Sequence, residues 1–183
     1  MTSMNQDLRH SLIILKRISN QLNHAEDSLR YIARQMYLAY NTDPINDAEL
    51  FNTKTTMYCI IFYLFMWYSS FLEEYERLPS RDAAARPRTI IARKNAQKYL
   101  DCLEQIFGDI RDIRNKILAH PYRLNSNTNA DPLPDDKFNV LHDNIMGHPN
   151  IEPYTQISNC IKLTIQVLEQ EFGEIDESHP ILS

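Results

Sequence analysis

The sequence predicts an all-α protein, an up-and-down bundle of four long helices with a short fifth helix. Three observations favour this class: only three glycines occur in 183 residues, helix-favouring residues abound, and apolar residues recur at steps of three and four. So few glycines leave little turn chemistry for a fold of many short strands. The length suits one domain, so we expect a helical domain at residues 1–173 and a loose acidic tail at 174–183.

The first helix is expected over about residues 4–40. Ser3 or Asn5 is a candidate N-cap. Pro44 follows the expected end, and the residue before a proline is disfavoured in the helical region. Leucine or methionine recurs every seven residues, with a second apolar line three positions later, so one face should be buried. The first line is Leu8, Leu15, Leu22, Leu29 and Met36, and the second is Ile18, Ala25 and Ile32.

The second helix is expected from about Ala48 to Leu78, with Pro79 ending it. Its middle, residues 57–68, is apolar all round and must be covered on several sides by other helices or by a second subunit. A membrane span needs about 20 apolar residues, whereas this run has twelve, three of them tyrosine. We therefore expect a buried helix of a soluble protein and no membrane.

A short basic link, Arg81 to Arg88, should connect the second and third helices, with Pro87 preventing a continuous helix there. The third helix is expected from about Ile90 to Ala119, ended by Pro121. Its apolar residues recur at steps of three and four: Tyr99, Leu103, Ile106, Ile110, Ile113 and Ile117.

The rest of the chain should hold a surface loop at residues 121–134, a short helix at 135–145 and a last helix. The last helix has Pro153 in its first turn and Gly173 just past its end, the usual positions of these residues. Its expected buried stripe is Tyr154, Ile157, Ile161, Ile165, Leu168 and Phe172.

The cysteines and the N-terminus indicate a cytoplasmic protein. Cys59, Cys102 and Cys160 are odd in number and have no CxxC spacing, which is typical of reduced thiols. The first seven residues are polar and lack the basic and apolar regions of a secretory signal.

The charge is distributed unevenly along the chain. The net charge of −5 disfavours a protein that coats nucleic acid without regard to sequence. Between Arg77 and Arg123, however, 11 Lys and Arg face 5 Asp and Glu, a local charge of +6. The positive charge is therefore concentrated in one segment, where it would attract a polyanion.

That segment contains the sequence RNKILAHPY, residues 114–122. Arg114 is followed by the polar Asn115, and five residues separate Arg114 from His120, with a small residue directly before the histidine. This arrangement in a small helical protein resembles the HEPN superfamily (higher eukaryotes and prokaryotes nucleotide-binding domains). Read without the family, the same charges would simply suit a helix C-terminus.

The resemblance implies a metal-independent endoribonuclease without a cofactor, of the kind found as toxins of toxin and antitoxin pairs or as abortive-infection effectors against phage. The side chains suit this chemistry. His120 can carry a proton near neutral pH, Arg114 can hold phosphate oxygens, and Asn115 can orient either group. The 2′-OH of RNA would attack the adjacent phosphorus, giving a 2′,3′-cyclic phosphate and a 5′-hydroxyl.

The geometry of one helix limits what one chain can do. Six residue steps place Arg114 and His120 about 120° apart around an ideal helix and about 9 Å apart along it, so they do not share a face. Two arrangements reconcile this: a helix that breaks at Ala119 ahead of Pro121, and a shared cleft into which, in the family, two subunits bring their motifs. We therefore expect a homodimer, with RNA as substrate and a cognate antitoxin protein as a candidate partner.

Further basic residues are candidates for RNA contact. Arg111, Lys116 and Arg123 lie nearest the motif and are the first choices. The basic stretch from Arg86 to Lys98 could follow a phosphate backbone or could be a solvated helical face.

Tyr122 has two interpretations. In a HEPN branch paired with nucleotidyltransferase antitoxins, a tyrosine two residues after the histidine looks like the site at which the partner adds AMP. Tyr122 matches that position, but the branch has four residues between Arg and His where this chain has five. Otherwise Tyr122 is an aromatic residue that anchors a loop.

The sequence also allows functions other than a nuclease. His142, Asp143 and His148 do not have the spacing of a metal site, so no metal is expected. The main alternative is a non-catalytic HEPN-like helical module that binds a partner protein or a nucleotide. A third idea is an antitoxin or immunity partner of another effector.

Overall fold

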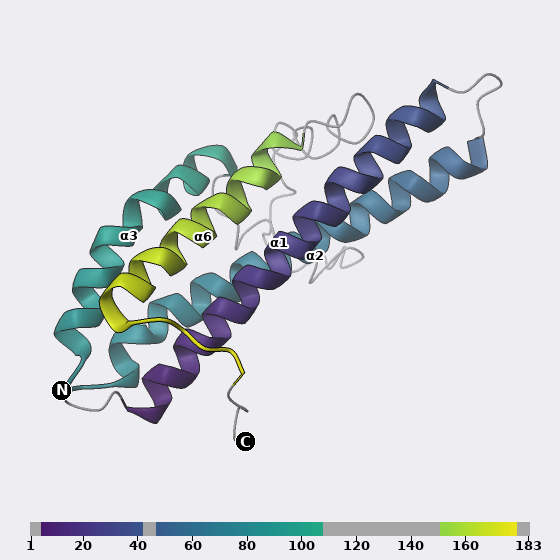
Figure 1. Cartoon of the computed structure of the whole chain (residues 1–183). Helices are drawn as coiled ribbons and strands as arrows, with labels where there is room; N and C mark the ends of the chain where they lie inside the picture. Colours follow the sequence, from purple (N-terminus) through teal and green to yellow (C-terminus); the bar gives the residue numbers. More distant parts are fainter. Residues whose placement is uncertain (1–4, 42–46, 108–150, 179–183) are drawn as a thin grey trace, which may run out of the picture.

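The protein is a bundle of antiparallel helices. The computed structural model describes residues 5–41, 47–107 and 151–178, and within these ranges it contains four helices and no strand. Neighbouring helices run in opposite directions, with α1 beside α2 and α3 beside α6 (Figure 1). The all-α class is confirmed; the loop and the short helix expected at 121–145 lie outside the described residues. The helices are α1 (Gln6–Tyr40), α2 (Asp47–Arg81), α3 (Arg86–Phe107) and α6 (Glu152–Phe172).

The seven-residue repeat of α1 is buried as predicted. Its five members from Leu8 to Met36 are all 1% exposed or less, while Ile32 on the second line is only half-buried. Asn5 is the N-cap: its Oδ1 accepts a hydrogen bond from the Asp7 backbone N–H at 3.2 Å. At the other end the Asn41 N–H donates to the carbonyls of Leu38 and Tyr37. Periodicity and capping chemistry together therefore determined this helix.

The prediction that Pro79 ends the second helix is wrong. α2 continues to Arg81 with Pro79 inside its last turn, where the missing proline N–H removes only one hydrogen bond. Contacts hold this turn together. The Arg81 guanidinium donates to both carboxylate oxygens of Glu74 at 2.8 and 2.9 Å, and Ser80 Oγ donates to the Arg77 carbonyl at 2.7 Å. Glu74 is buried and also accepts a hydrogen bond from Ser11 of α1.

The prediction that the third helix begins near Ile90 is also wrong. α3 begins at Arg86, so Pro87 lies in its first turn and the link is shortened to residues 82–85. The backbone N–H groups of a first turn have no partner within the helix, so a proline there loses nothing and its fixed φ suits the helix. The Thr89 N–H already reaches the Ala85 carbonyl at 3.0 Å.

Asp82 organises the turn between α2 and α3. Its Oδ1 accepts from the backbone N–H groups of Ala84 and Ala85 at 2.9 and 3.2 Å. Its Oδ2 accepts from the Asn5 N–H at 3.2 Å, which ties the start of α1 to this turn. These bonds, that from Asn5 first, lower the pKa of Asp82, because they stabilise the ionised carboxylate.

The hydrogen bonds to the Asp82 carboxylate should make the stability of the folded protein depend on pH. Because the pKa of the folded state is lowered, the stabilisation is fully present above the unfolded pKa of about 3.9 and is lost as the pH falls through the folded pKa. We expect Asp82→Asn to lower the melting temperature at pH 7. It should also reduce the difference between the melting temperatures measured at pH 7 and at pH 3. Asp27→Asn is the control, because Asp27 is exposed and its carboxylate makes no hydrogen bond or ion pair within the described ranges. If Asp82→Asn showed the same difference in melting temperature between pH 7 and pH 3 as the wild type, this role of Asp82 would be contradicted.

The last helix has the predicted ends, but the tail differs from the prediction. α6 has Pro153 in its first turn, and Gly173 follows it at φ 90°, a conformation that favours glycine. Residues 174–178 are not loose: they cross α1 (Figure 1), where Ile175 is buried. The Arg17 guanidinium of α1 donates to the Glu177 carbonyl at 2.9 Å.

The other described helices cover only part of the apolar middle of α2. Phe65 and Tyr68 are buried, but Tyr63 and Met66 are 39% and 52% exposed. Within the described ranges α2 is the one helix long and apolar enough to cross a membrane, a property shared by core helices of soluble proteins.

Candidate functional site

The residues predicted to form the site fall between α3 and α6, in 108–150, outside the described residues. The residues on both sides of this segment are described: Phe107 is the last described residue of α3, and Ile151 precedes α6. The structure therefore describes the residues that flank the candidate site on both sides. The predicted residues concerned are Arg111, Arg114, Asn115, Lys116, His120, Tyr122 and Arg123, with the rejected metal candidates His142, Asp143 and His148.

Both ends of the segment are anchored in one aromatic cluster. The Phe107 ring of α3 meets Phe65 of α2 edge-on, with centroids 5.5 Å apart, and lies 5.9 Å from the Tyr154 ring of α6. Phe65 and Tyr154 are 6.3 Å apart, and all three residues are buried. Such pairs contribute about 0.5–1.5 kcal/mol each beyond their burial. The described residues on both sides of 108–150 therefore pack in one cluster built from three helices.

The cluster is apolar in character despite its tyrosine. Burial raises the pKa of Tyr154, and the neighbouring Tyr58 raises it further. The phenol therefore titrates even further above neutral pH than an ordinary tyrosine, and its ring packs in the core.

The first turn of α6 is also held by α1. Arg30 donates from Nη2 to Thr155 Oγ1 at 2.8 Å while forming an ion pair with Glu26, one turn away, at 2.7 Å. Thr155 Oγ1 in turn donates to the Ile151 carbonyl at 3.3 Å. These bonds fix the position at which the chain returns from the predicted site.

The thiols of Cys102 on α3 and Cys160 on α6 lie beside each other between these two helices. Burial, followed by the adjacent Cys102 thiol, raises the pKa of Cys160 to about 11. Cys160 is buried, Cys102 and Cys59 are exposed, and all three are free thiols, as predicted. Cys160 is therefore an unreactive core residue at neutral pH.

Several of the basic side chains counted in the sequence already have partners in the bundle. Arg88 pairs with Glu171 at 2.9 Å and lies 5.1 Å from the Phe172 ring centroid. Arg93 lies 5.1 Å from the centroid of Tyr75, whose pKa burial raises to about 12. Such cations are partly neutralised or stacked, so they attract a phosphate backbone less than the sequence count indicates.

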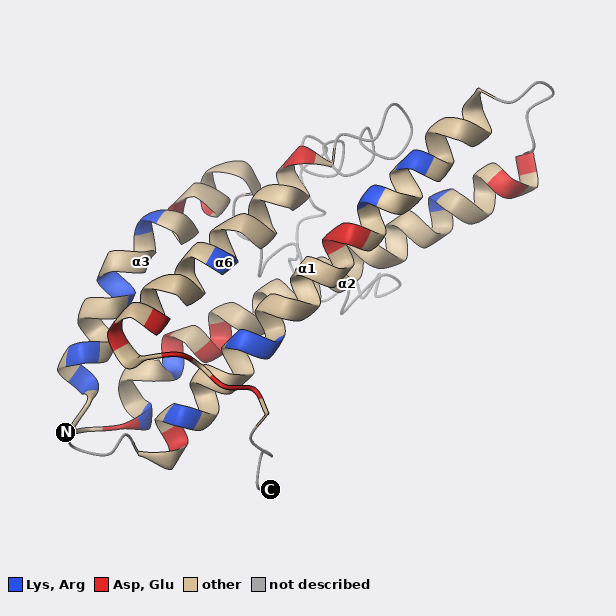
Figure 2. Cartoon of the chain, in the orientation of Figure 1, with Lys and Arg blue, Asp and Glu red and all other residues tan. Residues whose placement is uncertain are grey.

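The other basic side chains of α3 lie on its outer surface, and Arg77 is exposed on α2. Arg86, Lys94 and Lys98 are exposed, with Lys98 Nζ 4.9 Å from the Tyr99 ring centroid, and blue ribbon segments that mark Lys and Arg follow α3 from its first turn (Figure 2). Asp101 and Glu104 follow on the same helix toward Phe107. The described part of the positive segment is therefore a short basic face on the first half of α3, with acidic residues between it and the motif. Counting Lys and Arg in the sequence locates the positive segment, but it cannot show which of these side chains have partners in the bundle.

No metal centre is formed within residues 5–41, 47–107 and 151–178, where no three His, Cys, Asp or Glu side chains lie together as ligands would. No protein-family model, curated protein or solved structure matches the chain. The family resemblance therefore rests on residues 114–122 and on the helical architecture around them.

Proposed function

We propose that this protein is a metal-independent endoribonuclease of HEPN type, a toxin or phage-defence effector. The observation that carries the proposal is the RNKILAHPY sequence at residues 114–122. Two further observations support it. The chain is an all-helical bundle of small size, and the motif follows a helix whose first half has a basic outer face.

The proposed reaction needs a proton carrier and a fixed cation. One His120 accepts the proton of the ribose 2′-OH as its oxygen bonds to phosphorus, and the bond from phosphorus to the 5′-oxygen breaks. The leaving 5′-oxygen takes a proton from an imidazolium or from water. Arg114 neutralises the charge that grows on the phosphate oxygens, and Asn115 orients the phosphate. Arg111, Lys116 and Arg123 hold the RNA on either side.

The proposal includes a homodimer, a protein partner and a cytoplasmic location. Two chains supply the cleft, because Arg114 and His120 do not share a face of one helix. A cognate antitoxin would silence the enzyme, either by binding it or by modifying Tyr122. The cytoplasm suits three free thiols.

The proposal is tested by incubating the purified protein with a panel of structured and unstructured RNAs in EDTA. We expect cleavage that EDTA does not reduce. The purified protein must be shown to be folded by circular dichroism and dimeric by light scattering. A folded dimer that cleaves none of the RNAs would contradict the proposal and favour the non-catalytic helical module.

A further inference from the structure

Two thiols meet where α3 packs against α6. Cys102 of α3 is exposed, whereas Cys160 of α6 is 8% exposed. Burial raises the pKa of Cys160, and so do the charge of Cys102 and a hydrogen bond between the two side chains. The two sulfur atoms therefore lie close enough to interact, although both thiols are free.

The packing of the two helices independently places the thiols at one height. α3 and α6 are antiparallel (Figure 1), and the Phe107 and Tyr154 rings lie 5.9 Å apart near one end of the pair. From this contact Cys102 is five residues back along α3, and Cys160 is six residues forward along α6. At about 1.5 Å per residue these steps are about 7.5 Å and about 9 Å, so the thiols lie within about one residue of the same height.

The thiols also lie on the sides of the two helices that face each other. The ion pair of Arg88 with Glu171, at 2.9 Å, marks those sides. Cys160 and Glu171 are eleven residues apart, close to three full turns, so both side chains leave α6 on one side. Arg88 and Cys102 are fourteen residues apart, close to four turns, so they share a side of α3. Height and direction therefore agree in bringing the two sulfur atoms together.

The two thiols differ in their access to solvent. A small reagent can reach Cys102, whereas Cys160 is covered and is unreactive toward reagents in solution. Redox-sensing cysteines are typically accessible thiols next to a second thiol that resolves the first oxidation product. A buried thiol can take that second role, because contact within one molecule replaces an encounter in solution.

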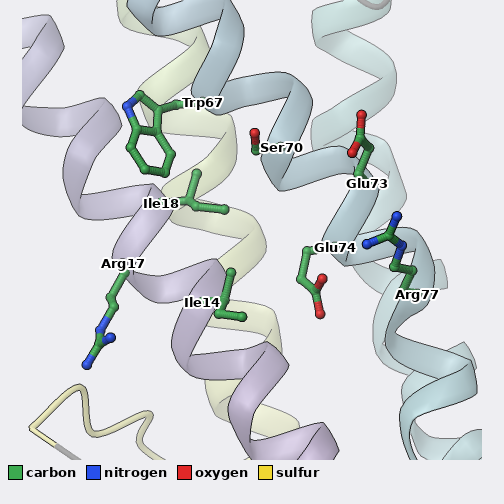
Figure 3. A pocket seen from close by; sticks show the side chains of 8 residues that line it. All are labelled: Ile14, Arg17, Ile18, Trp67, Ser70, Glu73, Glu74 and Arg77. Atoms are coloured by element: carbon green, nitrogen blue, oxygen red, sulfur yellow. The ribbon is translucent and has the colours of Figure 1, made fainter. Parts of the chain in front are cut away.

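Cys59, the third cysteine of the chain, has no thiol beside it. It is exposed on α2 and lines a hollow toward α1 together with Gln21 and Tyr63. A second hollow between α1 and α2, with Trp67 and Ser70 in its wall, contains no cysteine (Figure 3). The chain has three cysteines, and the other two lie on α3 and α6. Cys59 is therefore a matched control, an exposed thiol without a partner in the same molecule.

We infer that Cys102 and Cys160 form a reversible oxidation site, at which a peroxide converts the two thiols into a disulfide that joins α3 to α6. The Cys102 sulfur attacks one oxygen of hydrogen peroxide, and the O–O bond breaks to give a sulfenic acid and one water. The Cys160 sulfur then attacks the sulfenic sulfur, and the S–O bond breaks. The released hydroxyl takes the thiol proton of Cys160 and leaves as a second water. The two thiols lose two electrons to the peroxide, and exchange with a dithiol reverses the change.

The disulfide would tie together the two helices on either side of residues 108–150, which contain the predicted site. A reversible bond suits the proposed cytoplasmic location, because cytosolic thiols are kept reduced and disulfides there are usually transient. The inference does not rest on RNA cleavage, since thiol oxidation is measured on the protein itself.

The test treats the native protein with hydrogen peroxide, blocks the remaining thiols with N-ethylmaleimide and maps the cysteine peptides without reduction by mass spectrometry. We expect one linked pair of peptides, joined through Cys102 and Cys160, and recovery of both thiols with dithiothreitol. Cys59 should stay free, and Cys59→Ser should form the same link at the wild-type rate. A link to Cys59 or between two chains, or a Cys102 sulfinic acid beside a free Cys160, would overturn the inference.

A second measurement separates the roles of the two thiols. Dimedone traps sulfenic acids, so it reports how long the first oxidation product of Cys102 survives. In Cys160→Ser the second thiol is gone, and dimedone labelling at Cys102 should rise at least about tenfold above the wild type. Circular dichroism checks that this variant is folded, and the peptide mapping of the wild type needs no substitution. Equal labelling of the folded variant and the wild type would show that Cys160 does not resolve the product and would overturn the inference.

Discussion

Replacing His120 by alanine is expected to reduce RNA cleavage by about 10²–10⁴-fold, the usual contribution of a positioned acid or base. Alanine cannot accept the 2′-OH proton or return it to the leaving oxygen. RNA binding should change little, because the phosphate contacts come from Arg114 and its basic neighbours. Cleavage rates and RNA affinity, measured on the same substrate in EDTA, separate the two effects.

The control for this substitution is His148→Ala, which removes a histidine outside the motif. Its cleavage rate should match that of the wild type. The interpretation of His120 as proton carrier fails if His120→Ala retains most of the wild-type rate, or if both substitutions reduce the rate equally.

Truncating Phe65 to alanine is expected to destabilise the protein by about 3–5 kcal/mol, the usual cost of removing a buried aromatic ring. Phe65 is 1% exposed and touches both Phe107 and Tyr154, so its loss opens a cavity between three helices. The free energy of unfolding from urea titration, followed by circular dichroism, measures the change.

Phe51→Ala is the matched control, because Phe51 lies on the same helix but is 70% exposed. It should change the free energy of unfolding by less than about 0.5 kcal/mol. Similar losses for both phenylalanines would show that the cluster at the ends of the predicted site does not hold the bundle together.

The helices with a clear amphipathic pattern were predictable from the sequence. α1 needed only its seven-residue leucine line and the Asn5 cap, and both lie where predicted. α6 needed only Pro153 and Gly173 at its ends. In these helices local chemistry and burial favour the same boundaries, so local reasoning is sufficient.

The errors arose at prolines and at the tail, where contacts beyond the immediate neighbours in sequence add to local chemistry. Pro79 is tolerated because Arg81 is held by Glu74, and α3 begins at Arg86 after a turn that Asp82 organises together with Asn5. A proline rule applied to neighbouring residues cannot anticipate these contacts. The tail is a similar case, since Ile175 is buried against a helix more than 150 residues earlier.

The sequence shows the motif of the candidate site, but it does not determine how the motif residues are arranged in space. The order of Arg114, Asn115 and His120 is visible in the sequence, but their separation in space depends on the path of the chain and on a second copy. The side on which the middle of α2 is exposed was not predictable either. The middle of α2 is apolar on every side, so its pattern cannot distinguish the buried Phe65 from the exposed Met66.

The most direct test of the central claim is an analysis of the products from a cleaved RNA and from the same RNA with one 2′-deoxy sugar at the cleavage site. We expect the all-ribose substrate to yield a 2′,3′-cyclic phosphate and a 5′-hydroxyl in EDTA, and the 2′-deoxy substrate to stay intact at that site. Cleavage of the 2′-deoxy site, or products with a 5′-phosphate, would contradict attack by the 2′-OH and with it the proposed function.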